Sequence, residues 1–162
     1  MGVAAGTDQE IERLYRSRHA SFVALATAVT GDASEAIDVV QEAFATALRK
    51  RRGIRAEGSL EPWLWRIVLN KARDRRRKRG RTFSLRPDAP AVTSNGHDAD
   101  AALRTVLAEL PERQRETIFL RYYADLDYAA IAAMLGISPG TVAATLNAAH
   151  AALRQRIERV PE

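Results

Sequence analysis

The sequence contains no cysteine, which excludes disulfide bonds, cysteine-ligated metals and thiol-based redox sites. This composition fits a protein of the reducing cytoplasm, and we expect that location. None of the 162 residues belongs to an apolar run of 18 or more, so we expect no membrane span. The first eight residues carry neither a basic nor a long apolar segment, so we expect no secretion signal.

Residues for metal binding and catalysis are also scarce. The three histidines, His19, His97 and His150, are scattered and have no carboxylate at ligand spacing. Asp125 and Asp127 are close together, but helix capping explains such a pair better than acid–base chemistry. The sequence has no phosphate-binding glycine loop and no nucleophile motif. We therefore expect no metal, no cofactor and no enzymatic activity.

Positive charge is concentrated in one segment of the chain. Residues 49–81 contain 14 basic and three acidic side chains, whereas residues 1–48 contain three basic and seven acidic ones. Residues 101–162 contain seven of each sign and are neutral overall. A block of positive charge this dense attracts polyanions, and the attraction weakens as salt is added. The sequence therefore predicts a nucleic-acid-binding segment within residues 49–81.

Helical periodicity predicts three helices in the first part of the chain. A capping box at Thr7–Glu10 would open the first helix and Gly31 would end it. Asp32 would begin the second helix, and a third would run from about Leu60 to Gly80. These helices predict a first domain that spans residues 1–81.

A change of composition separates this domain from a second one. Residues 82–100 are rich in proline, serine, asparagine and glycine and have little periodicity, which predicts a flexible linker. Residues 101–162 regain helical spacing and predict a second domain. Since no segment alternates as a strand would, we predict an all-α fold of two small helical domains. The expected core of the second domain includes Leu107, Leu110, Ile118, Phe119 and Tyr122.

The second domain also contains the spacing of a helix-turn-helix. Gly136 supplies the turn conformation, Ser138 can cap the next helix, and Pro139 suits its first turn. Apolar residues at helical spacing would anchor both helices to the core, namely Ile131, Leu135, Val142 and Leu146. The outer face of the second helix would then be free for the DNA major groove.

Three motifs in a fixed order carry a resemblance to a known family. Asp38-Val-Val-Gln-Glu42 is similar to the D-L-V-Q-E helix of that family, and Pro62–Ile67 followed by Asn70 is similar to its W-L-Y-R-I-A-R-N helix. Leu110–Arg115 and Leu135–Val142 are similar to its second conserved domain. Over nearly its whole length, the chain resembles an extracytoplasmic-function (group four) sigma factor of bacterial RNA polymerase.

The resemblance implies a function in promoter-specific transcription initiation. The first domain would bind the clamp of core RNA polymerase and recognise and melt the minus-ten element. The second would bind the polymerase flap and the minus-thirty-five element, and an anti-sigma factor would be a further partner. The implied polymerase-binding residues are Asp38, Val39, Gln41 and Glu42. The implied minus-ten residues are Trp65, Arg66, Asn70, Arg73, Arg76, Arg77 and Lys78, and the implied minus-thirty-five residues are Thr141, Thr145, Asn147 and His150.

The two tryptophans of the third predicted helix cannot share a face, because they are two residues apart. We assign Trp63 to the core, where it would continue with Leu64 and Ile67. Two assignments stay open for Trp65: a position in the core, or a position in which its ring stacks on an unpaired base. The resemblance also implies that the loop at residues 53–61 forms a pocket for a base flipped out of the duplex.

The predicted recognition helix departs from the family pattern, which commonly runs G-T-V-K-S-R-L-H-R-A-R. Alanine occupies positions 143, 144 and 148, and His150 replaces an expected arginine. No lysine or arginine lies between Arg121 and Arg154, so this helix should bind DNA weakly by itself. It would read DNA through small side chains, or contribute little, or bind a protein instead.

Two alternative functions remain open, the first of which is favoured by the neutral recognition helix. One is a sigma-like decoy or adaptor that binds an anti-sigma factor through its second domain without reading minus-thirty-five DNA. The other is a helix-turn-helix repressor, which does not explain the Asp38–Glu42 motif.

Overall fold

The computed structural model describes residues 2–53, 60–80 and 105–159 of the chain. The predicted linker at 82–100 and most of the predicted loop at 53–61 lie outside these ranges. Among the described residues, no single helix is both long enough and apolar enough to cross a membrane.

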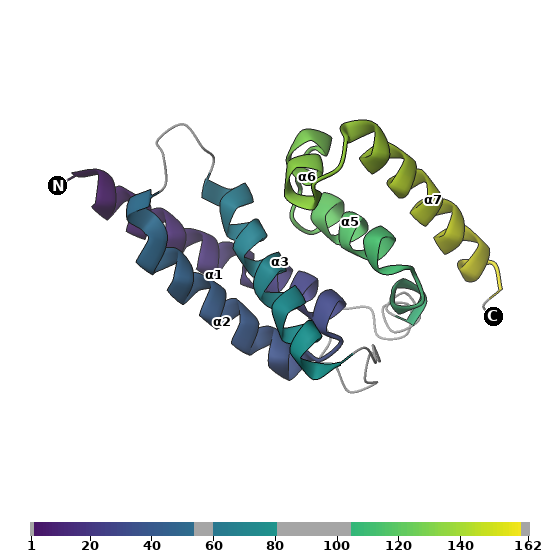
Figure 1. Cartoon of the computed structure of the whole chain (residues 1–162), viewed down its shortest axis with the longest axis horizontal. Coiled ribbons are helices and arrows are strands. Elements are labelled where there is room, and N and C mark those ends of the chain that lie inside the picture. The colour runs from purple at the N-terminus through teal and green to yellow at the C-terminus, as the bar shows by residue number, and fades with distance from the viewer. Residues whose placement is uncertain (1, 54–59, 81–104, 160–162) are drawn as a thin grey trace. The chain divides into compact units, whose positions relative to one another are not determined.

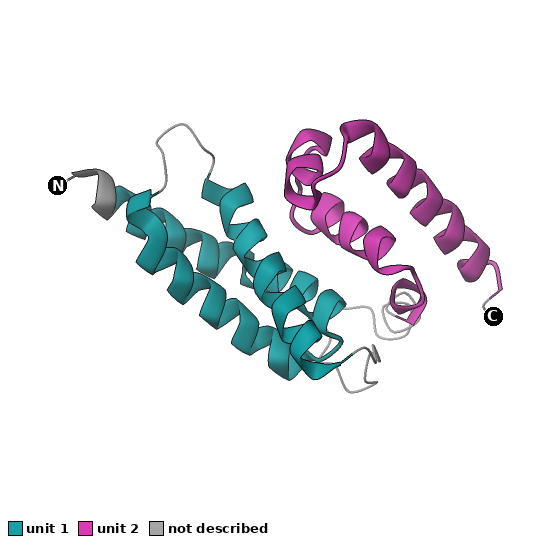
Figure 2. Cartoon of the chain, in the orientation of Figure 1, with its two compact units in different colours: residues 1–82 teal, residues 83–162 magenta. Residues whose placement is uncertain are grey.

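Every regular element in the described ranges is a helix (Figure 1). The chain divides into two compact units, residues 1–82 and residues 83–162 (Figure 2). These observations confirm the predicted all-α fold with two small helical domains.

Unit 1 is a bundle of three helices in which each helix packs against the other two. The helices are α1 (Gly2–Thr30), α2 (Ala33–Lys50) and α3 (Leu60–Arg79), and a short 3-10 turn, η1 (Arg51–Gly53), follows α2. The predicted start of α1 at Thr7 is wrong, because the helix begins five residues earlier. The alanines at positions 4 and 5 have the highest helix propensity of any residue type, so the helix does not need to begin at the capping motif.

The connection between α1 and α2 forms as predicted. Gly31 has a φ of 76° and ends α1 in the left-handed conformation. The carboxylate of Asp32 then accepts hydrogen bonds from the backbone N–H groups of Ser34 and Glu35, which caps α2. This turn places the first residues of α2 directly beside the last residues of α1.

Aromatic rings fill the centre of unit 1. Trp65 of α3 and Phe22 of α1 lie with ring centroids 4.0 Å apart, and both side chains are fully buried. Phe44 of α2 meets Phe22 edge-on at 5.1 Å and Tyr15 at 5.0 Å. Since each helix contributes to this cluster, burial of the rings determines how each helix is rotated about its axis.

Unit 2 contains the predicted helix-turn-helix. Helices α5 (Glu112–Tyr122), α6 (Tyr128–Leu135) and α7 (Pro139–Ile157) follow a helical segment at residues 105–108. The axes of α6 and α7 are bent by 99°. Gly136 closes α6 with a φ of 68°, and the hydroxyl of Ser138 accepts the N–H of Thr141 at 3.1 Å to cap α7.

The core of unit 2 follows the predicted pattern with one exception. All of the predicted core residues except Tyr122 are buried, as are Ile131, Leu135, Val142 and Leu146. Tyr122 is 59% exposed, so its assignment to the core is wrong. The chain turns at the end of α5, and Leu120 and Leu126 fill the core in its place.

We predict opposite effects for two glycines of the helix-turn-helix. Gly136→Ala should lower the unfolding free energy of unit 2 by about 1 kcal/mol, because its left-handed backbone disfavours a side chain. Gly140→Ala should raise it by up to about 1 kcal/mol, because the new Cβ lies an ordinary 3.8 Å from the Ser138 hydroxyl. Hydrogen exchange of α6 and α7 amides would measure both changes.

Both tryptophans lie in unit 1, so denaturation followed by tryptophan fluorescence serves as the internal control and should not change. Equal exchange rates in the two variants would contradict the assignment of Gly136 to the turn.

Candidate nucleic-acid interface

The outer face of α2 presents the predicted polar motif. Asp38, Gln41 and Glu42 are exposed, whereas Val39 and Val40 are fully buried against the other helices. Val39, one of the implied polymerase-binding residues, therefore offers no surface to a partner, because it belongs to the apolar stripe that holds α2 in the bundle. The motif supplies three polar side chains to the surface and two valines to the core.

Two large hydrophobic side chains lie on the same outer face and were not anticipated. Ile37 is 38% exposed and Leu48 is 40% exposed. Together with Gln41 and Ala45 they follow helical spacing along one side of α2. In the sequence, each of these two residues directly follows a residue of the buried stripe, and this position indicates the edge of the stripe. We call the exposed residues Ile37, Asp38, Gln41, Glu42, Ala45 and Leu48 the α2 outer face.

Helix α3 separates its side chains into a buried side and an outer side. Leu64, Trp65, Val68, Leu69 and Ala72 are buried in the bundle. Arg66 and Asn70 are exposed, and Arg73 is partly exposed at the same helical spacing. The structure therefore presents Arg66, Asn70 and Arg73 along one side of α3, which we call the α3 outer row.

The structure places Trp63 outside the predicted core position and assigns Trp65, for which two positions were open, to the core. Trp65 is fully buried and its indole N–H points to the Glu61 carboxylate at 3.4 Å, so it is not available to a base. Trp63 is only partly buried and lies on the side of α3 that carries Arg66 and Asn70. An apolar series at helical spacing begins at Trp65 and continues through Val68, Leu69 and Ala72. This series is the sequence signal that indicates a buried Trp65.

At the basic end of α3, two arginines form ion pairs with α2. Arg75 contacts Glu42 of α2 at 2.8 Å, and Arg79 contacts Glu35 of α2 at 2.9 Å. These two arginines are therefore engaged within unit 1.

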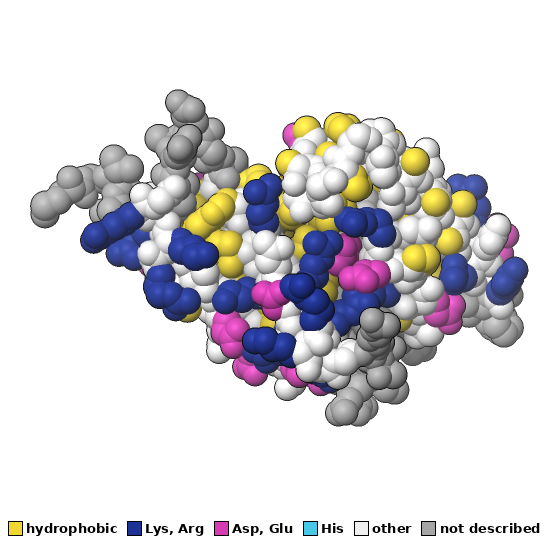
Figure 3. Space-filling model, in the orientation of Figure 1, with side chains coloured by type: hydrophobic (Ala, Val, Ile, Leu, Met, Phe, Trp, Pro, Cys, Tyr) yellow, Lys and Arg dark blue, Asp and Glu magenta, His cyan; other side chains and the backbone are white. Residues whose placement is uncertain are grey.

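Arg77 and Lys78 lie on the exposed side of this end. Arg77 bonds to Asp74 one turn earlier on the exposed side of the helix. Lys78 is exposed and makes no ion pair with any described residue, and Arg76 is partly exposed. Lys and Arg side chains are visible over α3 in Figure 3.

The outer face of α7 carries small and neutral side chains. Thr141 and Asn147 are exposed and Thr145 is partly exposed, together with the exposed alanines at positions 144, 148 and 151. The Thr145 hydroxyl donates to the Thr141 carbonyl at 2.7 Å. His150 is partly buried, and its Nε2 lies 2.8 Å from the Tyr122 hydroxyl of α5. The first half of α7 is correspondingly white and yellow in Figure 3.

Helix α5 brings two arginines to the ends of α6. The guanidinium of Arg113 donates to the carbonyl of Leu135 at 3.3 Å, beside the turn that precedes α7. The guanidinium of Arg121 donates to the carbonyl of Leu126 at 3.2 Å and lies 5.9 Å from the ring centre of Tyr128. No sequence pattern links Arg113 to a carbonyl 22 residues away, so sequence reasoning missed this cation.

Known proteins match both parts of the chain. The family "Sigma-70 region 2" matches residues 14–82, and "Sigma-70, region 4" matches residues 100–160. The RNA polymerase sigma-E factor of Streptomyces avermitilis is 31% identical over 96% of this chain and 89% of its own length. The ECF RNA polymerase sigma factor SigM of Mycobacterium tuberculosis is 28% identical over 92% of this chain and 78% of its own.

Two solved structures share the fold. The sigma factor RpoE of Bartonella quintana, solved with the anti-sigma factor NepR, superimposes with a TM-score of 0.79 at 21% identity. That comparison covers 94% of this chain and 99% of the other. CnrH, solved with the cytosolic domain of CnrY, superimposes with a TM-score of 0.76 at 23% identity, over 98% of this chain and 94% of the other.

The two tryptophans should respond differently to substitution. Trp65→Ala should lower the unfolding free energy of unit 1 by about 3–5 kcal/mol, because it empties the centre of the core. Trp63→Ala, the matched control on the outer side, should cost less than about 1 kcal/mol. Urea denaturation followed by the fluorescence of the remaining tryptophan would measure both. Stronger acrylamide quenching of Trp65 than of Trp63 would contradict this arrangement.

Proposed function

The chain belongs to the sigma-70 family, as an extracytoplasmic-function sigma factor that acts in transcription initiation, and we propose how its two units divide that work. Residues 1–81 form the domain that binds the polymerase clamp and the minus-ten element. Residues 101–162 form the domain that binds the flap and the minus-thirty-five element. Residues 82–100 link the two domains.

We propose that the α2 outer face docks on the clamp of core RNA polymerase. Its exposed Ile37 and Leu48 supply apolar contact area, and Asp38 and Gln41 supply charge and hydrogen bonds at its centre. Polar groups in such a surface contribute orientation and specificity as well as affinity, and the apolar side chains add buried contact area. The buried Val39 acts only by holding α2 in the bundle.

The α3 outer row is the main support for the proposal that unit 1 binds the minus-ten element. Arg66 and Arg73 would follow the phosphates of one strand, and Asn70 between them would hydrogen-bond to a base edge. Trp63, on the same side of the helix, would stack on an exposed base in the role first considered for Trp65. Stacking contributes about 1–3 kcal/mol per base and offsets the few kcal/mol needed to flip a base out of the duplex.

We propose that Arg76, Arg77 and Lys78 extend this surface along the phosphate backbone. Arg77 is bonded to Asp74 on the exposed side of α3, where both side chains are largely solvated. An exposed pair of this kind is worth little, so a phosphate would displace the carboxylate at small cost.

Minus-thirty-five binding by unit 2 would depend on cations outside the recognition helix. Arg113 and Arg121 are placed at the two ends of α6, next to a helix α7 whose outer face is neutral. We propose that they contact phosphates, while Thr141, Thr145 and Asn147 meet base edges. His150 would add a contact at the side of the helix. With so few cations, this unit would bind DNA securely only when the polymerase flap holds it in position.

An anti-sigma factor is a further proposed partner. The two solved proteins of the same fold were each captured with a partner, the anti-sigma factor NepR in one case and the cytosolic domain of CnrY in the other. By similarity of fold, we propose that this chain is also held by an anti-sigma factor.

The decisive experiment is promoter-specific initiation by core polymerase. We expect core RNA polymerase with this chain to initiate at discrete promoters, and the chain to compete with other sigma factors for the core enzyme. Asp38→Ala with Gln41→Ala should weaken this competition at least tenfold, because both side chains lie in the α2 outer face. Run-off transcription and competition binding would measure these effects.

Glu10→Ala with Glu12→Ala is the control, because it removes two exposed polar side chains from α1, outside the α2 outer face. Failure of the wild-type chain to compete for core polymerase at any salt concentration would contradict the proposed function.

The charge deficit of the recognition helix leads to a second expectation. Segment 101–162 alone should bind duplex DNA weakly, and Ala143→Lys with Ala148→Arg should strengthen binding. Each new phosphate contact should steepen the plot of log K against log salt by about 0.9. Gln at both positions is the matched control, because it adds length without charge. Tight, sequence-specific binding by the unmodified segment would contradict the charge argument.

A further inference from the structure

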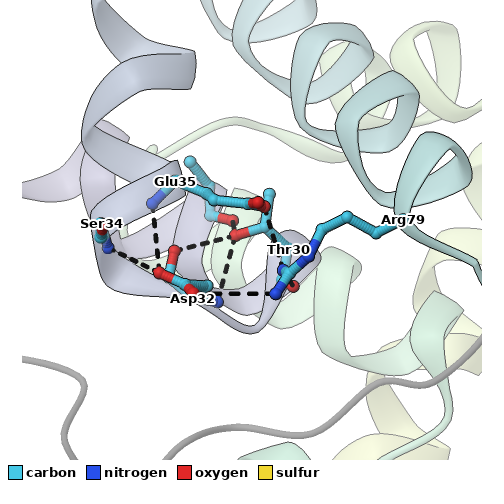
Figure 4. A network of polar contacts seen from close by, with 6 residues as sticks. Thr30, Asp32, Ser34, Glu35 and Arg79 are labelled. Carbon is cyan, nitrogen blue, oxygen red and sulfur yellow. Dashed lines mark hydrogen bonds and ion pairs between the residues drawn. The ribbon is translucent and has the colours of Figure 1, made fainter.

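Four residues at one end of unit 1 join the ends of all three helices (Figure 4). We call Thr30, Asp32, Glu35 and Arg79 the Arg79 junction. The guanidinium of Arg79, the last residue of α3, donates to the carbonyl of Thr30 at 3.2 Å and to the carboxylate of Glu35 at 2.9 Å. It also lies 3.7 Å from the carboxylate of Asp32. One side chain therefore contacts the last residue of α1 and the first turn of α2.

The acceptors in this junction are held in place by bonds of their own. Asp32 accepts the N–H groups of Ser34 and Glu35 as the cap of α2. The Thr30 hydroxyl donates to the Ala26 carbonyl at 2.8 Å, and the backbone N–H of Asp32 donates to the Thr30 hydroxyl at 3.3 Å. Arg79 therefore binds a preorganised set of oxygens.

The junction is also shielded from solvent more than an ordinary surface ion pair. The side chains of Asp32 and Glu35 are 19% and 24% exposed, and that of Arg79 is 38% exposed. Partial shielding reduces the screening that makes exposed ion pairs weak.

Charge repulsion in α3 explains why such an anchor is needed. Six of the seven residues from Arg73 to Arg79 are cations, and like charges one turn apart destabilise a helix. Arg75 relieves part of this repulsion through Glu42, and Arg79 relieves part of it at the very end of the helix. A guanidinium at the carboxyl ends of α1 and α3 also complements the partial negative charge of both helix ends.

We propose that Arg79 is a positioning residue for the DNA-binding surface of α3 and not a phosphate contact. Its bonds to α1 and α2 hold the last turn of α3 in place, so that the side chains of Arg77 and Lys78 extend from an ordered helix. Sequence alone would group Arg79 with its basic neighbours, whereas its guanidinium is turned toward two carboxylates and a carbonyl of its own domain. This inference rests on the proposed binding of DNA by α3.

A comparison of Arg79→Gln and Glu35→Gln in the full chain tests the proposal. Both variants should raise hydrogen exchange of the amides at residues 74–78 about tenfold, and the double variant should raise it no further than Arg79→Gln. Lys78→Gln is the matched control, because it removes the adjacent cation without touching the junction, and it should leave exchange unchanged.

Binding of a mixed-sequence single-stranded DNA of about 20 nucleotides separates positioning from direct contact. If Arg79 positions α3, Glu35→Gln should bind this DNA at least threefold more weakly than Asp38→Asn, which removes an exposed carboxylate from the same helix without disturbing Arg79. Lys78→Gln should reduce the salt slope by about 0.7, the value for one lost contact to a single strand.

Normal exchange in Glu35→Gln together with tighter DNA binding than Asp38→Asn would overturn the proposal, because a released Arg79 would then be contacting phosphate. Absence of binding by the wild-type chain would overturn the proposed function of α3. The exchange measurement needs no DNA and would still decide whether Arg79 fastens the helix.

Discussion

The burial of Trp65 in the core of unit 1 is the constraint on which the first domain depends. Its ring lies against Phe22 at 4.0 Å and leaves no exposed surface, so α3 can adopt only one rotation about its axis. With Trp65 inside, Trp63 lies on the outer side of α3 together with Arg66 and Asn70. A single aromatic contact therefore selects which side chains of α3 are available to a nucleic acid.

The same rotation divides the basic end of α3 between two environments. Arg75 and Arg79 lie along the seam with α2, where carboxylates neutralise them, while Arg77 and Lys78 remain on the exposed side. A dense run of cations is unfavourable for a helix, and the acidic side chains of α2 reduce that cost. Because Glu42 lies on the α2 outer face and contacts Arg75, one ion pair connects the proposed polymerase-binding surface to the basic end of α3.

The second unit assembles its surface from separate parts of the chain. Its recognition helix has the complete turn geometry of Gly136 and Ser138 but no cation on its outer face before Arg154. The fold brings Arg113 of α5 to the end of α6, where it is bonded to the carbonyl of Leu135. The positive charge near the helix-turn-helix is therefore greater than the sequence of α7 alone indicates.

Local chemistry explains which features the sequence determined by itself. The glycine turns at Gly31 and Gly136 and the caps at Asp32 and Ser138 depend on neighbouring residues only, and they formed as expected. Helical periodicity likewise sufficed for the fold class and for most of the core. Family motifs in the right order were enough to identify a sigma factor.

The packing of whole helices distinguishes side chains that have equivalent local patterns. Trp65 belongs to the side of α3 that packs against Phe22, a residue more than 40 positions away in the sequence, whereas Trp63 lies on the outer side. Val39 belongs to a polar motif but packs in the core, and Arg79 belongs to a basic run but bonds to Thr30 and Glu35. Burial and ion pairing across helices depend on how whole helices pack, and a pattern within one helix does not contain that information.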